Sequence, residues 1–155
     1  MEIKRTNRYL RLKGITDNKE EKVYTFEVYT IEGFDFKEDK LTCNDIKEEQ
    51  PSLYMFSYRY PTHFGQTCGK QVLNYCHKLL YLGKAEKLQE RPFNMRHNKF
   101  EDLGKTSCNS ISIYQCSQSE NPKDVESNIL NHYNFQFNEQ ENEDTDGKSI
   151  SEEEG

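Results

Sequence analysis

The chain has 155 residues and a net charge of −6, and Leu, Ile, Val and Phe together number only 32. This length suits one compact domain and excludes two domains of ordinary size. Ten Tyr and nine Phe compensate for the few aliphatic residues, because each buried aromatic ring removes roughly 150–250 Å² from water. No apolar run approaches the ~18 residues of a membrane-spanning helix, and no signal peptide is recognisable at the start. We therefore expect an intracellular protein, cytoplasmic or, in a eukaryote, nuclear, with no membrane partner.

The negative charge is concentrated at the end of the chain. Residues 139–155 contain eight acidic residues, one Lys and a single aliphatic residue, which predicts a disordered acidic tail. Residues 51–138 instead carry ten basic residues against seven acidic ones. A basic face for nucleic acid is therefore compatible with the acidic total.

The first fifty residues have the pattern of strands followed by a surface segment. β-forming side chains alternate or cluster in residues 8–12 and 22–29, on either side of a turn-rich segment at residues 14–18. Charge then dominates residues 37–50, which Pro51 closes. We expect an N-terminal β-rich extension over residues 1–50.

The next segment, residues 51–138, predicts a small α/β domain. Strands are expected at residues 53–58, 78–82 and 111–114, with an insertion over residues 59–77. One helix is expected around residues 87–98, and a second follows Pro122, where Val125, Ile129 and Leu130 recur at helical spacing. The expected fold is a mainly antiparallel three-stranded sheet flanked by helices, extended by the N-terminal strands.

Several residues of this segment stand at the positions and intervals of a known signature. Ser52-Leu53-Tyr54 and Tyr81-Leu82-Gly83 fall on the first two expected strands, and Arg91 follows Tyr81 by ten residues. Glu126 stands on the last expected helix, and Asn138 follows it by twelve residues. With this order and spacing, residues 51–138 resemble the GIY-YIG endonuclease family.

The resemblance implies metal-dependent hydrolysis of DNA phosphodiester bonds. It assigns water activation and positioning to Tyr54 and Tyr81, transition-state charge to Arg91, and the Mg²⁺ or Mn²⁺ ion to Glu126. This division is chemically reasonable, because Mg²⁺ needs few protein ligands and an Arg fork fits phosphate oxygens. The expected supporting residues are Gly83, Lys84, His97 and Asn138.

The same residues leave other interpretations open. Ser52 replaces the first signature Gly, Pro92 follows the expected catalytic Arg, and Met95 stands where many family members have His. These departures favour an alternative, a catalytically inactive nucleic-acid-binding or regulatory module on the same fold. A protein-interaction domain is a more remote possibility.

The cysteines do not suggest a metal or disulfide framework. Five Cys without any CxxC pair are typical of reduced thiols in an intracellular protein. Two Cys and two His within or next to the expected insertion have the residue types of a zinc site, but their spacing does not favour one. They are His63, Cys68, Cys76 and His77.

Overall fold

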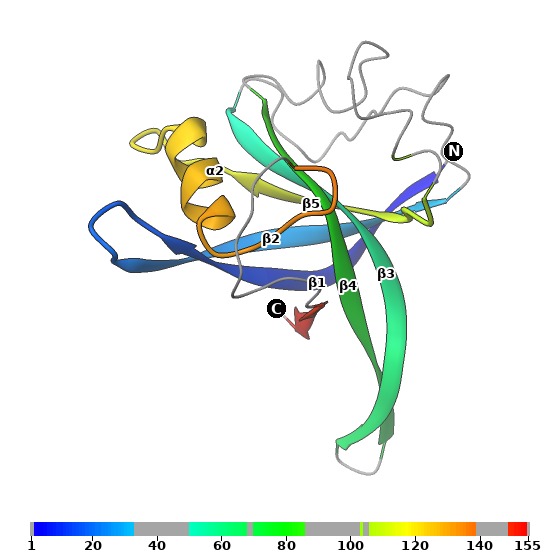
Figure 1. Cartoon of the computed structure of the whole chain (residues 1–155). Coiled ribbons are helices and arrows are strands. Elements are labelled where there is room, and N and C mark those ends of the chain that lie inside the picture. Colours follow the sequence, from blue (N-terminus) through cyan, green and yellow to red (C-terminus); the bar gives the residue numbers. More distant parts are fainter. Residues whose placement is uncertain are drawn as a thin grey trace.

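The computed structural model describes residues 2–32, 50–67, 70–85, 103, 106–138 and 149–154. Within them, one antiparallel sheet carries a single α-helix (Figure 1). The elements are β1 (Glu2–Ile15), β2 (Glu21–Glu32), β3 (Ser52–Thr67), β4 (Lys70–Ala85), β5 (Ser110–Gln115), α2 (Pro122–Leu130), β6 (Ile150–Ser151) and β7 (Glu153–Glu154). The strand order is β6-β4-β3-β5-β2-β1-β7.

The expected three-stranded sheet flanked by helices is wrong: the described fold is mostly β, a seven-stranded, nearly closed, barrel-like sheet with one short helix. Two features account for the difference. The segment 59–77 was expected to be an insertion, but its described residues, 59–67 and 70–77, continue β3 and β4 as the arms of one long hairpin. In addition, β2 pairs directly with β5, so residues 2–32 belong to the same sheet as residues 52–85. The helix expected around residues 87–98 lies outside the described residues.

The N-terminal hairpin follows from its side-chain pattern. In the register of β1 and β2, Leu10 faces Phe26 and Leu12 faces Tyr24, and all four side chains are buried. The register shifts between Arg5 and Tyr9, and Asn7 there has a φ of 59°. Asn tolerates this left-handed backbone better than most residues, so it suits a bulge.

The sheet is buried on both faces around β3. Leu53 and Met55 belong to one apolar cluster, whereas Tyr54 and Phe56 belong to a second one. Because successive strand residues point to opposite faces, the two clusters lie on opposite sides of the sheet. This double burial explains the uninterrupted apolar run at the start of β3.

Helix α2 covers the first of these clusters. It contributes Val125, Ile129 and Leu130 to the cluster that contains Leu53. Asn121 caps its N-terminus by accepting a hydrogen bond from the backbone N–H of Lys123. No helix of the described residues is long and apolar enough to cross a membrane.

The last described residues connect the two edges of the sheet. β6 pairs with β4, β7 pairs with β1, and Glu152 stands between these two-residue strands. We call residues 149–154 the C-terminal clasp. It lies between β1 and β4 in Figure 1, within the segment whose composition predicts disorder.

Candidate functional site

Two of the expected catalytic residues, Tyr54 and Tyr81, lie together on neighbouring strands. Their ring centroids are 6.1 Å apart. Tyr54 is fully buried and Tyr81 is half-buried. A Cβ atom built on Gly83 would lie 2.3 Å from Cζ of Tyr54 and 2.4 Å from its Oη. Gly83 is therefore required for packing, because any side chain there would occupy the space of the Tyr54 ring.

Lys84 and Glu126 form a second group. Nζ of Lys84 lies 3.2 Å from Oε1 of Glu126, and the two side chains are 44% and 19% exposed. In the register of β3 and β4, Lys84 faces Leu53, whereas Gly83 faces Tyr54. Lys84 and Glu126 therefore lie on the α2 side of the sheet, and the tyrosine pair lies on the opposite side.

Asn138 fixes the stretch of β4 that carries both groups. Its Nδ2 donates to the carbonyl oxygen of Leu82 at 3.0 Å, and its Oδ1 accepts from the N–H of Leu82 at 2.9 Å. Phe137 adds a backbone bond from its N–H to the carbonyl of Leu80. The chain after α2 thus satisfies backbone groups of Leu80 and Leu82 on β4.

The remaining expected site residues are not described. Arg91 and His97 lie outside the described residues, as do the side chains of His63 and Cys68. Within the described part of the chain, no group of three or more His, Cys, Asp and Glu side chains is placed to hold a metal ion.

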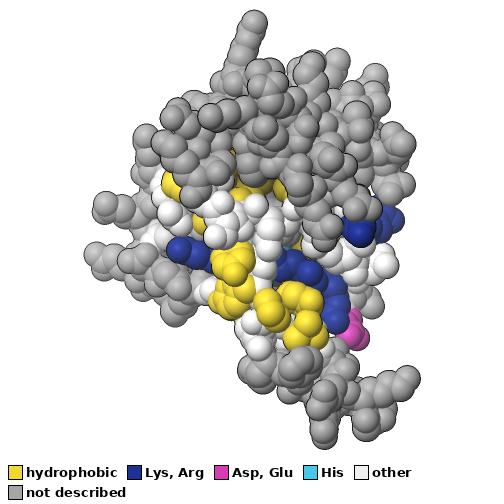
Figure 2. Space-filling view, turned by 90° about the vertical axis from the view of Figure 1, so that its right-hand side faces the viewer, with side chains coloured by type: hydrophobic (Ala, Val, Ile, Leu, Met, Phe, Trp, Pro, Cys, Tyr) yellow, Lys and Arg dark blue, Asp and Glu magenta, His cyan; other side chains and the backbone are white. Residues whose placement is uncertain are grey.

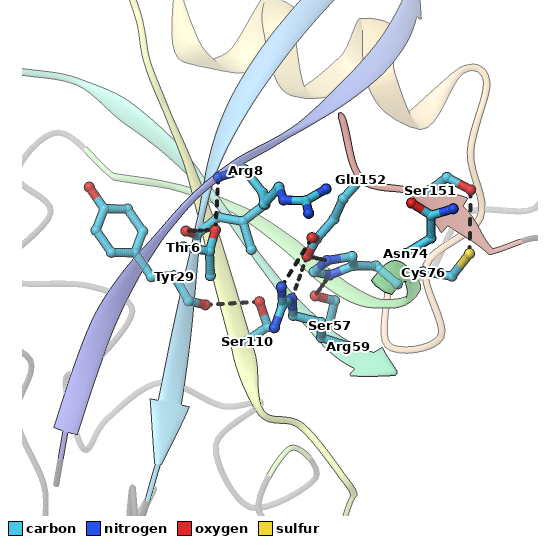
Figure 3. A network of polar contacts seen from close by, with 12 residues as sticks. Thr6, Arg8, Tyr29, Ser57, Arg59, Asn74, Cys76, Ser110, Ser151 and Glu152 are labelled. Atoms are coloured by element: carbon cyan, nitrogen blue, oxygen red, sulfur yellow. Dashed lines mark hydrogen bonds and ion pairs between the residues drawn. The ribbon is translucent and has the colours of Figure 1, made fainter. Parts of the chain in front are cut away.

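The structure also contains a polar cluster that the sequence did not predict, formed by Ser57, Arg59, His77 and Glu152 (Figure 3). Oγ of Ser57 lies 2.7 Å from Nδ1 of His77, and Nε2 of His77 lies 2.6 Å from Oε1 of Glu152. Arg59 donates from Nε to Oε1 and from Nη2 to Oε2 of the same carboxylate, the second bond at 3.1 Å. The C-terminal clasp therefore places one carboxylate against two neighbouring strands.

The cluster is almost completely enclosed. The side chains of His77 and Glu152 are fully buried, Ser57 is buried, and the Arg59 side chain is only 15% exposed. Burial lowers the pKa of His77, and this effect outweighs the opposing effect of Glu152. Burial alone would raise the pKa of Glu152, but hydrogen bonds from His77 and Arg59 and the positive charge of Arg59 hold it below the usual value.

These protonation states give a consistent hydrogen-bond pattern. A neutral His77 donates its Nε2–H to the Glu152 carboxylate and accepts the Ser57 hydroxyl at Nδ1. The guanidinium of Arg59 and the carboxylate then balance in charge. Ser57, His77 and Glu152 are the residue types of a hydrolase triad, but with the clasp in place the Ser57 hydroxyl is buried and closed to substrate. In this state the cluster holds an anion, the Glu152 carboxylate, and does not attack a substrate.

Two further thiols, the partly buried Cys108 and the buried Cys116, have no comparable role. Burial raises the pKa of Cys108 to about 12 and that of Cys116 to about 11. Both cysteines are free thiols. Because the thiolate is the reactive form, neither group is suited to nucleophilic chemistry.

Comparison of the chain with protein-family models, with curated proteins and with solved structures finds no match. The function is therefore argued from the residues and their geometry.

Proposed function

We propose that the chain is a metal-dependent DNA endonuclease in which Glu126 holds the metal ion and Lys84 contacts phosphate. The contact between Lys84 and Glu126 is the observation that supports this most. The two residues are 42 positions apart in the chain, and the sequence pattern alone places both of them in the expected site. Gly83 and the Asn138-bound Leu82 directly precede Lys84 on β4.

The residue types of this pair suit the proposed roles. A partly exposed carboxylate is adequate for Mg²⁺, which retains several waters and takes few protein ligands. A bound ion would supply positive charge and a water of lowered pKa. The ammonium of Lys84 would orient the Glu126 carboxylate and bind phosphate oxygens, and Arg91 would stabilise the charge that develops on the phosphate.

The tyrosines take a different role in this proposal. Tyr54 is fully buried on the face opposite Glu126, so we assign it as a positioning residue that packs on Gly83. Tyr81 contacts Tyr54 from the next strand and supports the same packing. Neither phenol reaches the carboxylate side of the sheet.

A mixed basic and aromatic surface also favours binding to nucleic acid. The rings of Tyr58 and Tyr60 are 5.5 Å apart on β3, and the exposed Lys78 pairs with Tyr58 across β4. Figure 2 shows Lys and Arg side chains among hydrophobic ones on this side of the molecule. Aromatic rings that stack with bases, next to cations that contact phosphates, are typical of surfaces that bind single strands.

The test is cleavage of supercoiled plasmid and of branched DNA with Mg²⁺, Mn²⁺ or EDTA. We expect metal-dependent nicking that falls by about a hundredfold or more in Glu126→Gln and in Arg91→Ala, because each removes a charge that the transition state needs. Asp124→Asn is the matched control, because Asp124 is exposed on the same helix and its substitution also removes one negative charge. Cleavage that persists in Glu126→Gln contradicts the proposal.

The second candidate is a nucleic-acid-binding module without catalysis. The burial of Tyr54 and its separation from Glu126 favour it, because neither Tyr54 nor Tyr81, the two phenols expected to activate water, lies on the carboxylate side of the sheet. A binding module would shift the same DNA in a gel-shift assay with every metal tested and would cut it with none.

A further inference from the structure

The polar cluster on β3 and β4 is built like an anion-binding site. Two N–H groups of Arg59 and one of His77 converge on a single carboxylate, that of Glu152. The Cζ atom of Arg59 lies 3.6 Å from the centroid of the Tyr75 ring, which holds the guanidinium plane in place. Such a planar fork fits carboxylates and phosphates equally well.

The backbone beneath the fork is also fixed. The side chain of Asn109 accepts from the N–H of Arg59 at 2.7 Å and donates to its carbonyl oxygen at 2.9 Å. Ser57 donates to Nδ1 of His77 and so directs the ring's Nε2–H toward the anion. The donors are thus held by contacts within β3, β4 and the residues before β5, independently of the clasp.

The clasp itself is held chiefly through Glu152. Its two strands are two residues long, and Ile150 is its one apolar residue. The ion pairs of Arg8 with Glu154 and of Arg11 with Glu153 are largely exposed and contribute little. The enclosed contacts of Glu152 are therefore the strongest connection between the clasp and the sheet.

We propose that Ser57, Arg59 and His77 form a binding site for a phosphate group, which Glu152 occupies until the clasp is displaced. If Glu152 leaves, Arg59 becomes a cation without its counter-charge in a poorly solvated position, which favours entry of another anion. The proposal rests on the proposed function in one respect: the phosphate is taken to be that of a nucleic acid. Inorganic phosphate is the other source of the same chemistry.

The clasp can be locked reversibly. Cys76 and Ser151 are direct partners across β4 and β6, and Sγ of Cys76 lies 3.4 Å from Oγ of Ser151. Directly paired positions in antiparallel strands have Cα atoms about 4.5–5.5 Å apart, within the range of a disulfide. The variant Ser151→Cys should therefore tether the clasp when oxidised and release it when reduced.

The experiment measures how the full chain binds a fluorescein-labelled single-stranded DNA 15-mer in EDTA, where no cleavage occurs. We expect Glu152→Gln to bind about tenfold more tightly than the unmodified chain, because the competing carboxylate is neutralised. Oxidised Ser151→Cys should bind more weakly, with reductant restoring its affinity. Glu153→Gln is the matched control for charge, since it alters the exposed neighbouring carboxylate. Adding Arg59→Lys to Glu152→Gln should abolish the tighter DNA binding, because Lys lacks the planar pair of donors that a guanidinium presents.

A second measurement separates the two sources of phosphate. Inorganic phosphate should raise the melting temperature of Glu152→Gln and leave that of Arg59→Lys/Glu152→Gln unchanged. If phosphate stabilises the variant and the DNA does not bind, the site takes a small phosphate and only the link to nucleic acid is overturned. Equal DNA affinities for Glu152→Gln and Glu153→Gln, together with equal affinities for oxidised and reduced Ser151→Cys and no effect of phosphate, overturn the proposal. None of these readouts requires cleavage, so failure of the nuclease assay does not affect them.

Discussion

At the scale of the residue, Gly83 shows how one missing side chain allows a large ring to be buried. The ring of Tyr54 occupies the space above Gly83 so closely that a Cβ atom would meet its Cζ and Oη. Ring and glycine lie directly opposite each other in the register of β3 and β4. The pair is therefore a unit, and changing either member alters the position of the other.

We expect Gly83→Ala to lower the free energy of unfolding by roughly 1–3 kcal/mol, because the added methyl group overpacks the site. Urea denaturation followed by circular dichroism measures this loss. In a Tyr54→Leu background the same substitution should cost less, since the phenol is absent. An equal cost in both backgrounds would show that the clash with Tyr54 is not its cause.

The local sequence does not reveal on which face of the sheet a residue lies or whether an acidic residue is buried. The spacing selects Tyr54, Tyr81, Lys84 and Glu126 as candidates, but the face of the sheet that each occupies depends on the pairing of Leu53 with Lys84. Glu152 is harder still to predict from the sequence, because seven other acidic residues lie in the same segment. Its burial depends on the tertiary fold.

At the scale of the element, the start of α2 is determined by a few local contacts. Asn121 caps the helix, Pro122 stands in its first turn, and Asp124 places negative charge near the positive end of the helix dipole. The helix is nine residues long, too short to be stable alone. Its cap and its packing on the sheet therefore matter together.

Replacing the cap tests this account. We predict that Asn121→Ala lowers the free energy of unfolding by about 1 kcal/mol, because the N–H of Lys123 loses its acceptor. Asn121→Asp should retain most of the stability, since a carboxylate accepts the same bond. Thermal denaturation of the three proteins gives the comparison. A loss as large in Asn121→Asp as in Asn121→Ala would exclude capping as the reason.

Elements differ in how well the sequence predicts them. The strands at residues 53–58, 78–82 and 111–114 and the helix after Pro122 were recognisable, because each has a local periodicity that burial enforces. Residues 59–77 were misinterpreted because Pro61 and Gly65 suggest a loop, whereas pairing between β3 and β4 continues past both with a register shift. The pairing of β2 with β5 joins residues about eighty positions apart and leaves no local signature.

At the scale of the whole molecule, acid should weaken the fold through the enclosed cluster. The folded state lowers the pKa of His77, so the unfolded state binds a proton first as pH falls below its ordinary pKa of about 6.5. Stability therefore declines from that pH downward. The lowered pKa of Glu152 adds a second loss below its ordinary value, in the same direction.

Of the charged groups around His77, Glu152 raises the pKa of the imidazole and Arg59 lowers it, and burial is the largest effect and sets the sign. Urea denaturation at pH 7.5 and 5.5 should show lower stability at pH 5.5. His77→Gln keeps a donor toward Glu152 but cannot titrate, so its stability should change less between the two pH values. His132→Gln is the control, because His132 lies in another part of the molecule, beside Tyr133. Equal pH dependence in His77→Gln and the unmodified chain would contradict the assignment.

The clasp also determines when this sheet can be completed during synthesis. β7 pairs Arg8 and Tyr9 with Glu154 and Glu153, so these two residues of β1 lack these partners until residues far later in the chain have been made. Until residues 149–154 leave the ribosome, the edges of β1 and β4 that they cover stay open, and Arg59 and His77 lack their carboxylate. Open strand edges are where nascent chains associate wrongly. Translation that stops before residue 152 would therefore release a chain with two exposed edges and an unpaired internal cation, a natural substrate for chaperones and proteases.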